Sequence, residues 1–281
     1  MPCHLKRSVF HWFTLLWAAA CLLNSGTAAW AQDNDNIAAV CDGSDQVTVL
    51  QANHQAHAAQ AYWLNGQWLQ WPGKSNSGTT RTFSLIASRH SQLNVHTGRI
   101  AEGVDQRWPL QVASTASTEF LSPALRTRFA FLQPGVVLQM PPLPTSTLRE
   151  LHAQQHLLVE EDAQGRVVAA TRLQAAGALD ALFAPTAHKL TLGPRLQGAR
   201  AHLTVWAPSA QQVQLCLYPG ATSLASQHQA MQRDTASGTW SLSLPASAAG
   251  TYYKFAVTVH VPGVGLVRNL VTDPYSVSLS A

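Results

Sequence analysis

Acidic clusters are the first candidates for chemistry in this chain, because hydrolytic sites often rely on positioned carboxylates. Glu160, Glu161 and Asp162 are consecutive, and Asp273 lies in the segment VTDPY. The three consecutive acids fall at a predicted hairpin turn, where acidic residues are normally solvated. Asp273 precedes a proline and is typical of a turn carboxylate that accepts backbone hydrogen bonds. No catalytic residue is predicted among them.

Histidine pairs are the next candidates, because imidazole is a common metal ligand. His54 with His57, and His152 with His156, have the spacing of metal-binding pairs. The second pair would place both rings on one face of a helix. Neither pair has a nearby cysteine or a third ligand in view, so no metal site is predicted. No cofactor is predicted either, because the glycines of PGVGLV do not open a helix after a strand.

Tryptophan rings are the remaining candidates, because the apolar face of a sugar packs on a flat ring while polar side chains bind its hydroxyls. Trp12, Trp17 and Trp30 fall in the leader predicted below. The other six of the nine tryptophans are Trp63, Trp68, Trp71, Trp108, Trp206 and Trp240. These six tryptophans could therefore bind sugar, provided that their rings are exposed.

The neighbours of each tryptophan in the sequence indicate its role. Trp63, Trp68 and Trp71 surround one predicted hairpin and form either an exposed stacking platform or a cross-strand cluster, the cluster being favoured. Trp206 lies on the face opposite the apolar residues of its strand, directed outward or toward a neighbouring domain. Trp240 shares a face with apolar residues, which favours a core role.

The first half of the chain is predicted to consist mainly of strands. The aromatic-rich segments AQAYWL and QWLQWP flank Asn65 and Gly66, and this pair predicts a hairpin with a type I′ turn. The segment TRTFSLIAS alternates in the manner of a strand with one buried face.

A second hairpin is predicted where QHLLVEED and RVVAATRLQ bracket residues 163–165. Between the two hairpins, FLSPALRTRFAFLQPG predicts a short helix. The proline-rich MPPLPTS that follows cannot be a central strand.

The second half has a clearer pattern, beyond a Gly- and Pro-bearing junction that places a domain boundary near Leu190. Its strands are marked by Leu203 and Val205; Val213, Leu215 and Leu217; Trp240, Leu242 and Leu244; and Tyr253, Phe255, Val257, Val259 and Val261. Short alternating strands separated by turns predict an immunoglobulin-like β-sandwich. The fold class is therefore mainly β, with two consecutive β-sandwich domains, 46–190 and 191–281.

The N-terminal residues predict export. A basic start, an apolar run over residues 9–23 and an A-x-A site at residues 29–31 indicate a cleaved signal peptide, 1–31, and a periplasmic, extracellular or outer-surface location. The apolar run is shorter than the roughly 20 residues of a spanning helix. A lipid anchor at Cys21 is the less favoured alternative, because the residues before it lack the expected leucine. Residues 32–45 are polar and predict a flexible tether.

Two cysteines, Cys41 and Cys216, remain after the leader. They could pair in an oxidising compartment. Because Cys41 lies in the polar tether and Cys216 on a predicted strand, a free small residue on that strand is the favoured interpretation.

Composition limits the partners. The chain has 281 residues, a net charge of +4 and only 11% charged residues, whereas soluble domains carry roughly 25%. Its arginines are scattered singly, so nucleic acid is not a predicted partner. A polar, weakly charged surface is compatible with neutral ligands such as glucans.

Residues 191–281 resemble a known family. The segments LTVWAPSAQQVQLCLYPG, SGTWSLSLP, GTYYKFAVTVHV and VTDPYSVSLSA resemble the carbohydrate-binding module of family 48 that precedes the catalytic barrel in pullulanases and limit dextrinases, starch-debranching members of glycoside hydrolase family 13. Five earlier segments follow the order of the N-terminal β-sandwich of the same enzymes: AYWLNGQWLQWPG, TFSLIASRHSQL, LRTRFAFLQPG, QHLLVEEDAQG and ALDALFAP.

The resemblance implies a non-catalytic role. Such enzymes hydrolyse α-1,6-glucosidic bonds with two carboxylates about 5–5.5 Å apart. None of the fourteen acidic residues here lies in the family's D-x-x-x-N-H, G-F-R-x-D or H-D settings, and there are no eight βα units to hold them. By itself the chain is expected to be inactive, and its implied partners are an α-glucan such as starch, glycogen or pullulan and a barrel fused C-terminally.

Lys254 has the most specific implied role. In YYKF it points away from the core face, and it matches the lysine of the Y-K-F motif that contacts glycogen in related regulatory domains. Those domains place a tryptophan in the following hairpin, where this chain has PGVGL. Lys254, Trp206, Trp63, Trp68 and Trp71 are the candidate sugar contacts. The alternative is a structural or interaction β-sandwich module that has lost sugar binding.

Overall fold

The computed structural model describes residues 37–43, 46–75, 81–114 and 121–278. These residues belong to one compact unit that spans Gln32–Ala281. The predicted signal peptide and Cys21 lie outside the described residues. Within the described ranges, no helix has the length and apolar character needed to cross a membrane.

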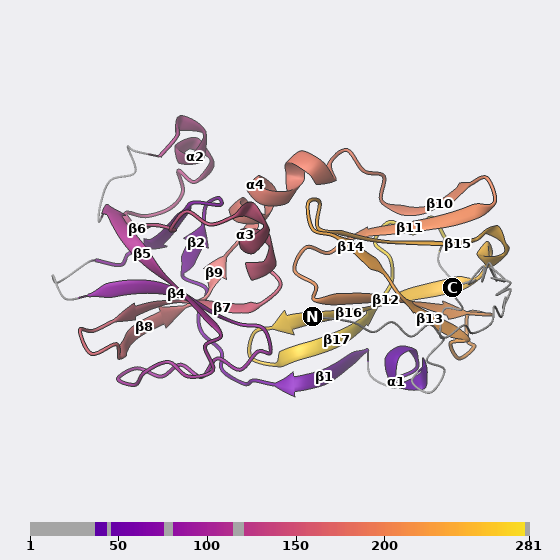
Figure 1. The fold of residues 1–281 in the computed structure, drawn as a ribbon, viewed down its shortest axis with the longest axis horizontal. Coiled ribbons are helices and arrows are strands. Elements are labelled where there is room, and N and C mark those ends of the chain that lie inside the picture. The colour runs from indigo at the N-terminus through magenta and orange to yellow at the C-terminus, as the bar shows by residue number, and fades with distance from the viewer. Residues whose placement is uncertain (1–36, 44–45, 76–80, 115–120, 279–281) are drawn as a thin grey trace, which may run out of the picture. The chain divides into compact units, whose positions relative to one another are not determined.

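An N-terminal body is built on one antiparallel sheet that folds over itself (Figure 1). Its strand order is β8-β7-β4-β5-β6-β3-β2-β9, and only β2 and β9 pair in parallel. The strands are β2 (Ala61–Trp63), β3 (Trp68–Pro72), β4 (Thr82–Ser88), β5 (Gln106–Ser114), β6 (Gly135–Gln139), β7 (Gln155–Glu161), β8 (Val167–Thr171) and β9 (Leu173–Gln174). The first part of β5 pairs with β4 and the second part with β6, so the two halves enclose a common core.

Three helices complete this body: α2 (Pro123–Arg128), α3 (Thr145–Leu151) and α4 (Ala176–Ala187). Leu148 and Leu151 of α3 and Phe183 of α4 enter the core beside Trp63 and Phe83. The short helix predicted between the hairpins is confirmed as α2, whose N-cap Ser122 accepts a hydrogen bond from the Leu125 N–H.

A C-terminal body is a sandwich of two sheets, with orders β1-β17-β16-β12-β13 and β10-β11-β15-β14. The strands are β1 (Val47–Ala52), β10 (Gly193–Gln197), β11 (Arg200–Trp206), β12 (Gln212–Tyr218), β13 (Gln227–Ala230), β14 (Gln232–Asp234), β15 (Thr239–Pro245), β16 (Tyr252–Val261) and β17 (Gly265–Val271), with a 3-10 turn at Ala246–Ala248. The apolar alternation of β11, β12, β15 and β16 supplies its core, as the sequence predicts. The predicted boundary near Leu190 falls between α4 and β10.

The first hairpin is confirmed, but its predicted turn type is wrong. Neither Asn65 nor Gly66 has the positive φ of a type I′ turn. Instead, the Leu64 N–H donates to Trp68 O at 2.8 Å, and Asn65 Oδ1 accepts hydrogen bonds from the N–H groups of Gln67 and Trp68 at 2.8 and 2.9 Å. The side chain of Asn65 closes the loop, so no left-handed backbone is needed.

Strand β4 differs from its prediction of one buried face. Phe83 and Leu85 enter the main core, while Ile86 on the opposite face enters a second cluster with Leu93 and Val159. Strand β4 is a central strand that is covered on both sides, so its two alternating sets of side chains pack into two different cores.

The residues before the N-terminal body also differ from prediction. Residues 37–41 of the predicted tether form helix α1 (Ile37–Cys41), and β1 pairs antiparallel with β17 of the C-terminal body. A Cβ added at Gly265 (φ +119°) would lie 2.0 Å from Gln51 O, so this pairing requires glycine there. Pairing with β1 satisfies the backbone N–H and C=O groups along an edge of β17 that would otherwise be exposed.

Cys41 and Cys216 form a disulfide, with Cα atoms 5.8 Å apart and a sequence separation of 175. The favoured prediction of a free Cys216 is therefore wrong. Helix α1 places Cys41 beside β12. This helix could not be predicted from the sequence, because five residues are too few for a periodic pattern.

Candidate functional site

Lys254 lies on the face of β16 opposite the sandwich core. Successive residues of a strand alternate between faces, so Lys254 shares its face with Tyr252, while Tyr253 and Phe255 contact the core. Lys254 is exposed and opposite Cys216 of β12. Its Nζ stands 5.9 Å from the ring centroid of Tyr218, within range of a cation–π contact. The structure thus places an exposed cation next to an aromatic ring.

Tyr252 is a ring on this face that the sequence analysis missed. It is 43% exposed and pairs in register with Tyr218, which is only 8% exposed. The sequence did contain a signal for Tyr252, because a spacing of two residues on a strand places it on the same face as Lys254. Together, Tyr252 and Lys254 form what we call the outer face of β16, which offers a flat ring and a hydrogen-bond donor to solvent.

Helix α1 covers the part of the sheet next to this outer face. Cys41 is tied to Cys216, and its backbone oxygen accepts a hydrogen bond from the Tyr218 hydroxyl at 2.8 Å. Asp42 Oδ1 accepts from the Ala225 N–H at 2.9 Å. Burial, with a smaller effect of the Asp42 carboxylate, raises the pKa of Tyr218 to about 12, so its hydroxyl remains a donor. Tyr218 is therefore fixed beneath α1 and presents no free ring face.

Most predicted tryptophan contacts lie elsewhere. Trp63 is fully buried and Trp71 is 4% exposed, so neither can stack on a sugar, and both are withdrawn as candidate contacts. Trp68 is half-buried at the start of β3. The burial of Trp63 and Trp71 agrees with the favoured cluster interpretation, because both rings enter the core of the N-terminal body.

Trp206 lies between the two bodies. Its ring is half-buried against the core of the N-terminal body, and its Nε1–H donates to Ser237 O at 2.9 Å. Trp206 was predicted to be directed either outward or toward a neighbouring domain, and the structure shows the second arrangement. The predicted core role of Trp240 is confirmed, with a 5% exposed ring whose Nε1–H donates to Ala207 O.

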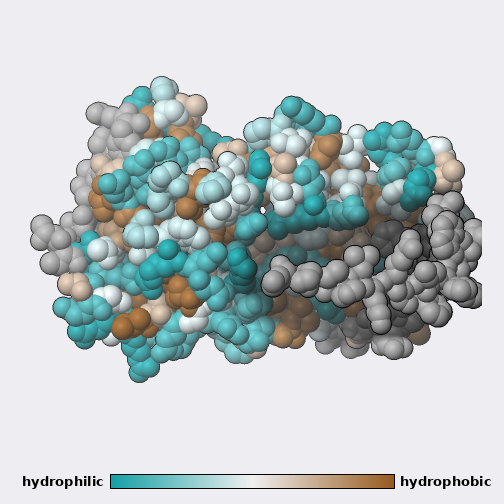
Figure 2. Space-filling view, in the orientation of Figure 1, coloured by the Kyte–Doolittle hydropathy of each residue, from teal (hydrophilic) through white to brown (hydrophobic). Residues whose placement is uncertain are grey.

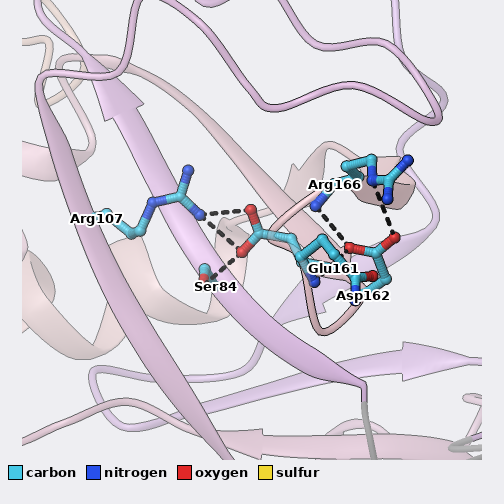
Figure 3. A network of polar contacts seen from close by, with 6 residues as sticks. Ser84, Arg107, Glu161, Asp162 and Arg166 are labelled. Carbon is cyan, nitrogen blue, oxygen red and sulfur yellow. Dashed lines mark hydrogen bonds and ion pairs between the residues drawn. The ribbon is translucent and has the colours of Figure 1, made fainter.

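Two of the three consecutive acids are not solvated, contrary to prediction. Glu160 and Glu161 are 3% and 5% exposed at the end of β7. Glu161 accepts two hydrogen bonds from Arg107 Nη1, at 2.6 and 2.7 Å, and one from Ser84 Oγ at 3.1 Å (Figure 3). Glu160 pairs with Lys74 at 2.5 Å. The turn begins only after these two residues, which is why both carboxylates are buried with partners.

Asp273 has the structural role that the sequence predicts, and Asp162 lies partly exposed at the predicted turn. Asp162 Oδ1 accepts from the backbone N–H groups of Gln164 and Arg166 at the hairpin turn (Figure 3). Asp273 is 2% exposed and accepts from the Tyr253 hydroxyl at 2.7 Å and the Tyr275 N–H at 2.8 Å. Burial, with help from the Asp273 carboxylate, raises the pKa of Tyr253. All these carboxylates are engaged in holding the fold.

The histidine pair does not share a helix face. α3 ends at Leu151, so His152 is its C-cap, and His156 lies on β7. Their ring centroids are 6.1 Å apart, and His152 packs on Trp63 at 4.5 Å. In the described ranges, no three His, Cys, Asp or Glu side chains are grouped to hold a metal ion.

Known proteins share this architecture. The family model of the pullulanase N2 domain matches residues 58–181, and that of carbohydrate-binding module 48, the isoamylase N-terminal domain, matches residues 191–276. The pullulanase of Klebsiella pneumoniae is 30% identical over 223 residues, which are 79% of this chain and 19% of that protein. The chloroplastic pullulanase 1 of Arabidopsis thaliana is 28% identical over 224 residues, 79% of this chain and 22% of that protein.

A solved structure agrees with both sequence matches. The maltotriose complex of PulA from Klebsiella pneumoniae has a TM-score of 0.67 and 30% identity, covering 79% of this chain and 23% of that chain. The chain belongs to the non-catalytic N-terminal region of the pullulanases. This pullulanase region spans about a fifth of the length of the curated relatives it matches. Its described residues form two β-sandwich bodies.

Proposed function

We propose that this pullulanase region binds α-glucan chains, such as those of starch, glycogen or pullulan, on the outer face of β16. Its role is to present branched glucan to a family 13 barrel that is fused C-terminally and hydrolyses α-1,6-glucosidic bonds. The observation that carries the proposal is the exposed pair of Lys254 and Tyr252 in a module of family 48. The ring of Tyr252 supplies a stacking surface and Lys254 donates to sugar hydroxyls.

The overall polarity of the chain supports a neutral ligand. Figure 2 shows hydrophilic and hydrophobic residues interspersed over the face that it draws, with the hydrophobic ones in small groups. Only 11% of the residues are charged. A glucan carries no charge, so its recognition relies on ring contacts and hydrogen bonds.

A structural or interaction module without sugar binding is the second candidate function. Two observations favour it. The β16–β17 hairpin, residues 262–264, contains no aromatic residue, and α1 occupies the sheet next to Lys254 and covers Tyr218. This candidate makes the opposite prediction in the experiment below.

The test is affinity electrophoresis in gels with and without amylopectin. We expect the wild-type protein to be retarded, and the variants Lys254→Ala and Tyr252→Ala each to weaken binding about five- to tenfold, as expected for loss of about 1 kcal/mol. Lys189→Ala and Tyr275→Ala are matched controls, because Lys189 is also exposed and Tyr275 is 40% exposed. Unchanged migration of the folded wild-type protein with amylopectin would support the structural module instead.

We also propose export, with residues 1–31 as a cleaved signal peptide and a lipid anchor at Cys21 as the alternative. The Cys41–Cys216 disulfide supports this proposal, because disulfides persist in oxidising compartments. Intact-mass analysis of the secreted protein distinguishes the two forms. A mature chain that begins at Gln32 supports the signal peptide, whereas a lipid-bearing N-terminal Cys21 supports the anchor.

A further inference from the structure

A cavity of about 180 Å³ opens between the N-terminal and C-terminal bodies, away from the outer face of β16. Its walls come from the chain before β2, from the α3–β7 turn, from the β8–β9 turn and from β16. The polar residues that carry the argument are His57, His152, Gln154, Arg172 and His260. Lys254 does not line this cavity, so the inference below does not depend on the proposed glucan site.

Three residues that line this cavity each carry a buried polar atom without a hydrogen-bond partner in the described part of the chain: His57 Nε2, His152 Nε2 and Gln154 Oε1. His152 is 5% exposed and Gln154 is 9% exposed. A buried polar atom without a partner destabilises a fold, and native structures retain few of them. Three such atoms on residues that line one cavity therefore point to a molecule that completes their hydrogen bonds.

The walls are held in place by contacts outside the cavity. The ring of His152 packs on Trp63, and a hydrogen bond of 2.8 Å joins His260 Nδ1 to the hydroxyl of Ser91. Gln211 Nε2 of the C-terminal body donates to Arg89 O and Ala153 O of the N-terminal body, at 2.8 and 3.0 Å. The cavity is therefore preorganised by contacts between the two bodies.

The charge of the cavity is low. Burial lowers the pKa of His152 to about 3, with a smaller effect of His156, and burial lowers that of His260 to about 4. Both rings are neutral at pH 7. Arg172 is the only Lys, Arg, Asp or Glu among the described residues that line the cavity, and its Nε donates to His57 O at 2.5 Å.

The unpartnered atoms select among ligand classes. An acceptor-only anion such as sulfate leaves Gln154 Oε1 without a donor. A cation would be repelled by Arg172, and none of the described residues that line the cavity is a carboxylate. A hydroxyl both donates and accepts, so it satisfies Gln154 Oε1 and also a neutral imidazole nitrogen in either tautomer. Leu157, Leu173 and Val259 supply apolar wall for the carbon skeleton of such a ligand.

We propose that this cavity is a binding site for one small neutral polyhydroxy molecule, a single sugar ring or a polyol of similar size. A cavity of roughly 150 Å³ holds a six-membered ring such as benzene, so the volume here suits one ring. A ligand of about twelve heavy atoms gives a Kd on the order of millimolar.

The test is an NMR titration of the full chain with D-glucose, and separately with glycerol, following the backbone amides of Ala153, Gln154 and Leu157. We expect saturable shifts with one of these probes at millimolar concentrations. Gln154→Leu removes the acceptor, and Ser209→Phe places a ring at the exposed rim; each should weaken binding at least tenfold. Ser223→Phe is the matched control, because Ser223 is also exposed and does not line the cavity.

Each outcome decides the proposal. Saturable shifts that are lost in Gln154→Leu and Ser209→Phe but kept in Ser223→Phe and Lys254→Ala support the site and separate it from the outer face of β16. No saturable shift at 100-fold the expected millimolar Kd (about 0.1 M) overturns it and leaves a cavity filled by water. Displacement of the probe by sulfate also overturns it, because the site would then select charge.

Discussion

Removal of the Cys41–Cys216 disulfide should lower the stability of the C-terminal body. The cross-link closes a loop with a sequence separation of 175 residues, and chain entropy for a loop of that size gives an upper value of about 5 kcal/mol at 25 °C. Typical disulfides give about 2–4 kcal/mol, so we expect a loss of about 3–5 kcal/mol. For a protein of this size that corresponds to a fall in Tm of about 6–20 °C.

The assay is thermal and urea unfolding of the Cys41→Ala/Cys216→Ala variant, compared with wild type under oxidising and reducing conditions. Alanine avoids placing a hydroxyl at position 216, where the side chain is fully buried. Tyr218→Phe is the control for the noncovalent contact of α1, because it removes only the hydrogen bond to Cys41 O, worth about 1 kcal/mol. A loss below about 1 kcal/mol in the double variant, or equal effects of the two variants, would refute the reasoning.

Two further predictions concern buried charge. Because the pKa of His152 is about 3 in the fold against an ordinary value of 6.5, the unfolded state binds its proton first as pH falls. Stability should thus fall by about 1.4 kcal/mol per pH unit from this group between pH 6.5 and about pH 3, a slope that His152→Gln should reduce. Glu161→Gln should cost about 1–3 kcal/mol in urea unfolding, because Arg107 and Ser84 lose a buried carboxylate. Asp180→Asn, in the exposed pair with Arg128, should cost less than about 1 kcal/mol. Equal costs for the two acids would contradict the burial argument.

Much of the C-terminal body could be predicted from sequence. Val213, Leu215 and Phe255 lie where alternation places them, because each strand there has one core face. The turn role of Asp273 was also predictable, since an Asp before a proline satisfies backbone groups locally. The mechanism in both cases acts over neighbouring residues, so the sequence pattern is sufficient.

Features that depend on contacts between residues far apart in the sequence could not be predicted from local patterns. Glu161 was expected in solvent, but Arg107, from a strand far away in sequence, makes its burial possible. The pairing of β1 with β17 and the bond of Cys41 to Cys216 join residues that no local pattern connects. Tyr252 became a candidate sugar contact only when its exposure beside Lys254 was known.

By itself, the sequence determined the strand-rich architecture, its order of two sandwich bodies and its relation to the non-catalytic part of pullulanases. These features depend on the two-residue periodicity of strands and on short turn-forming segments. Tertiary structure alone decided which tryptophans are buried, which carboxylates find partners, and how the two bodies enclose a cavity with unpartnered histidine and glutamine atoms. Burial and pairing depend on residues that meet only after folding.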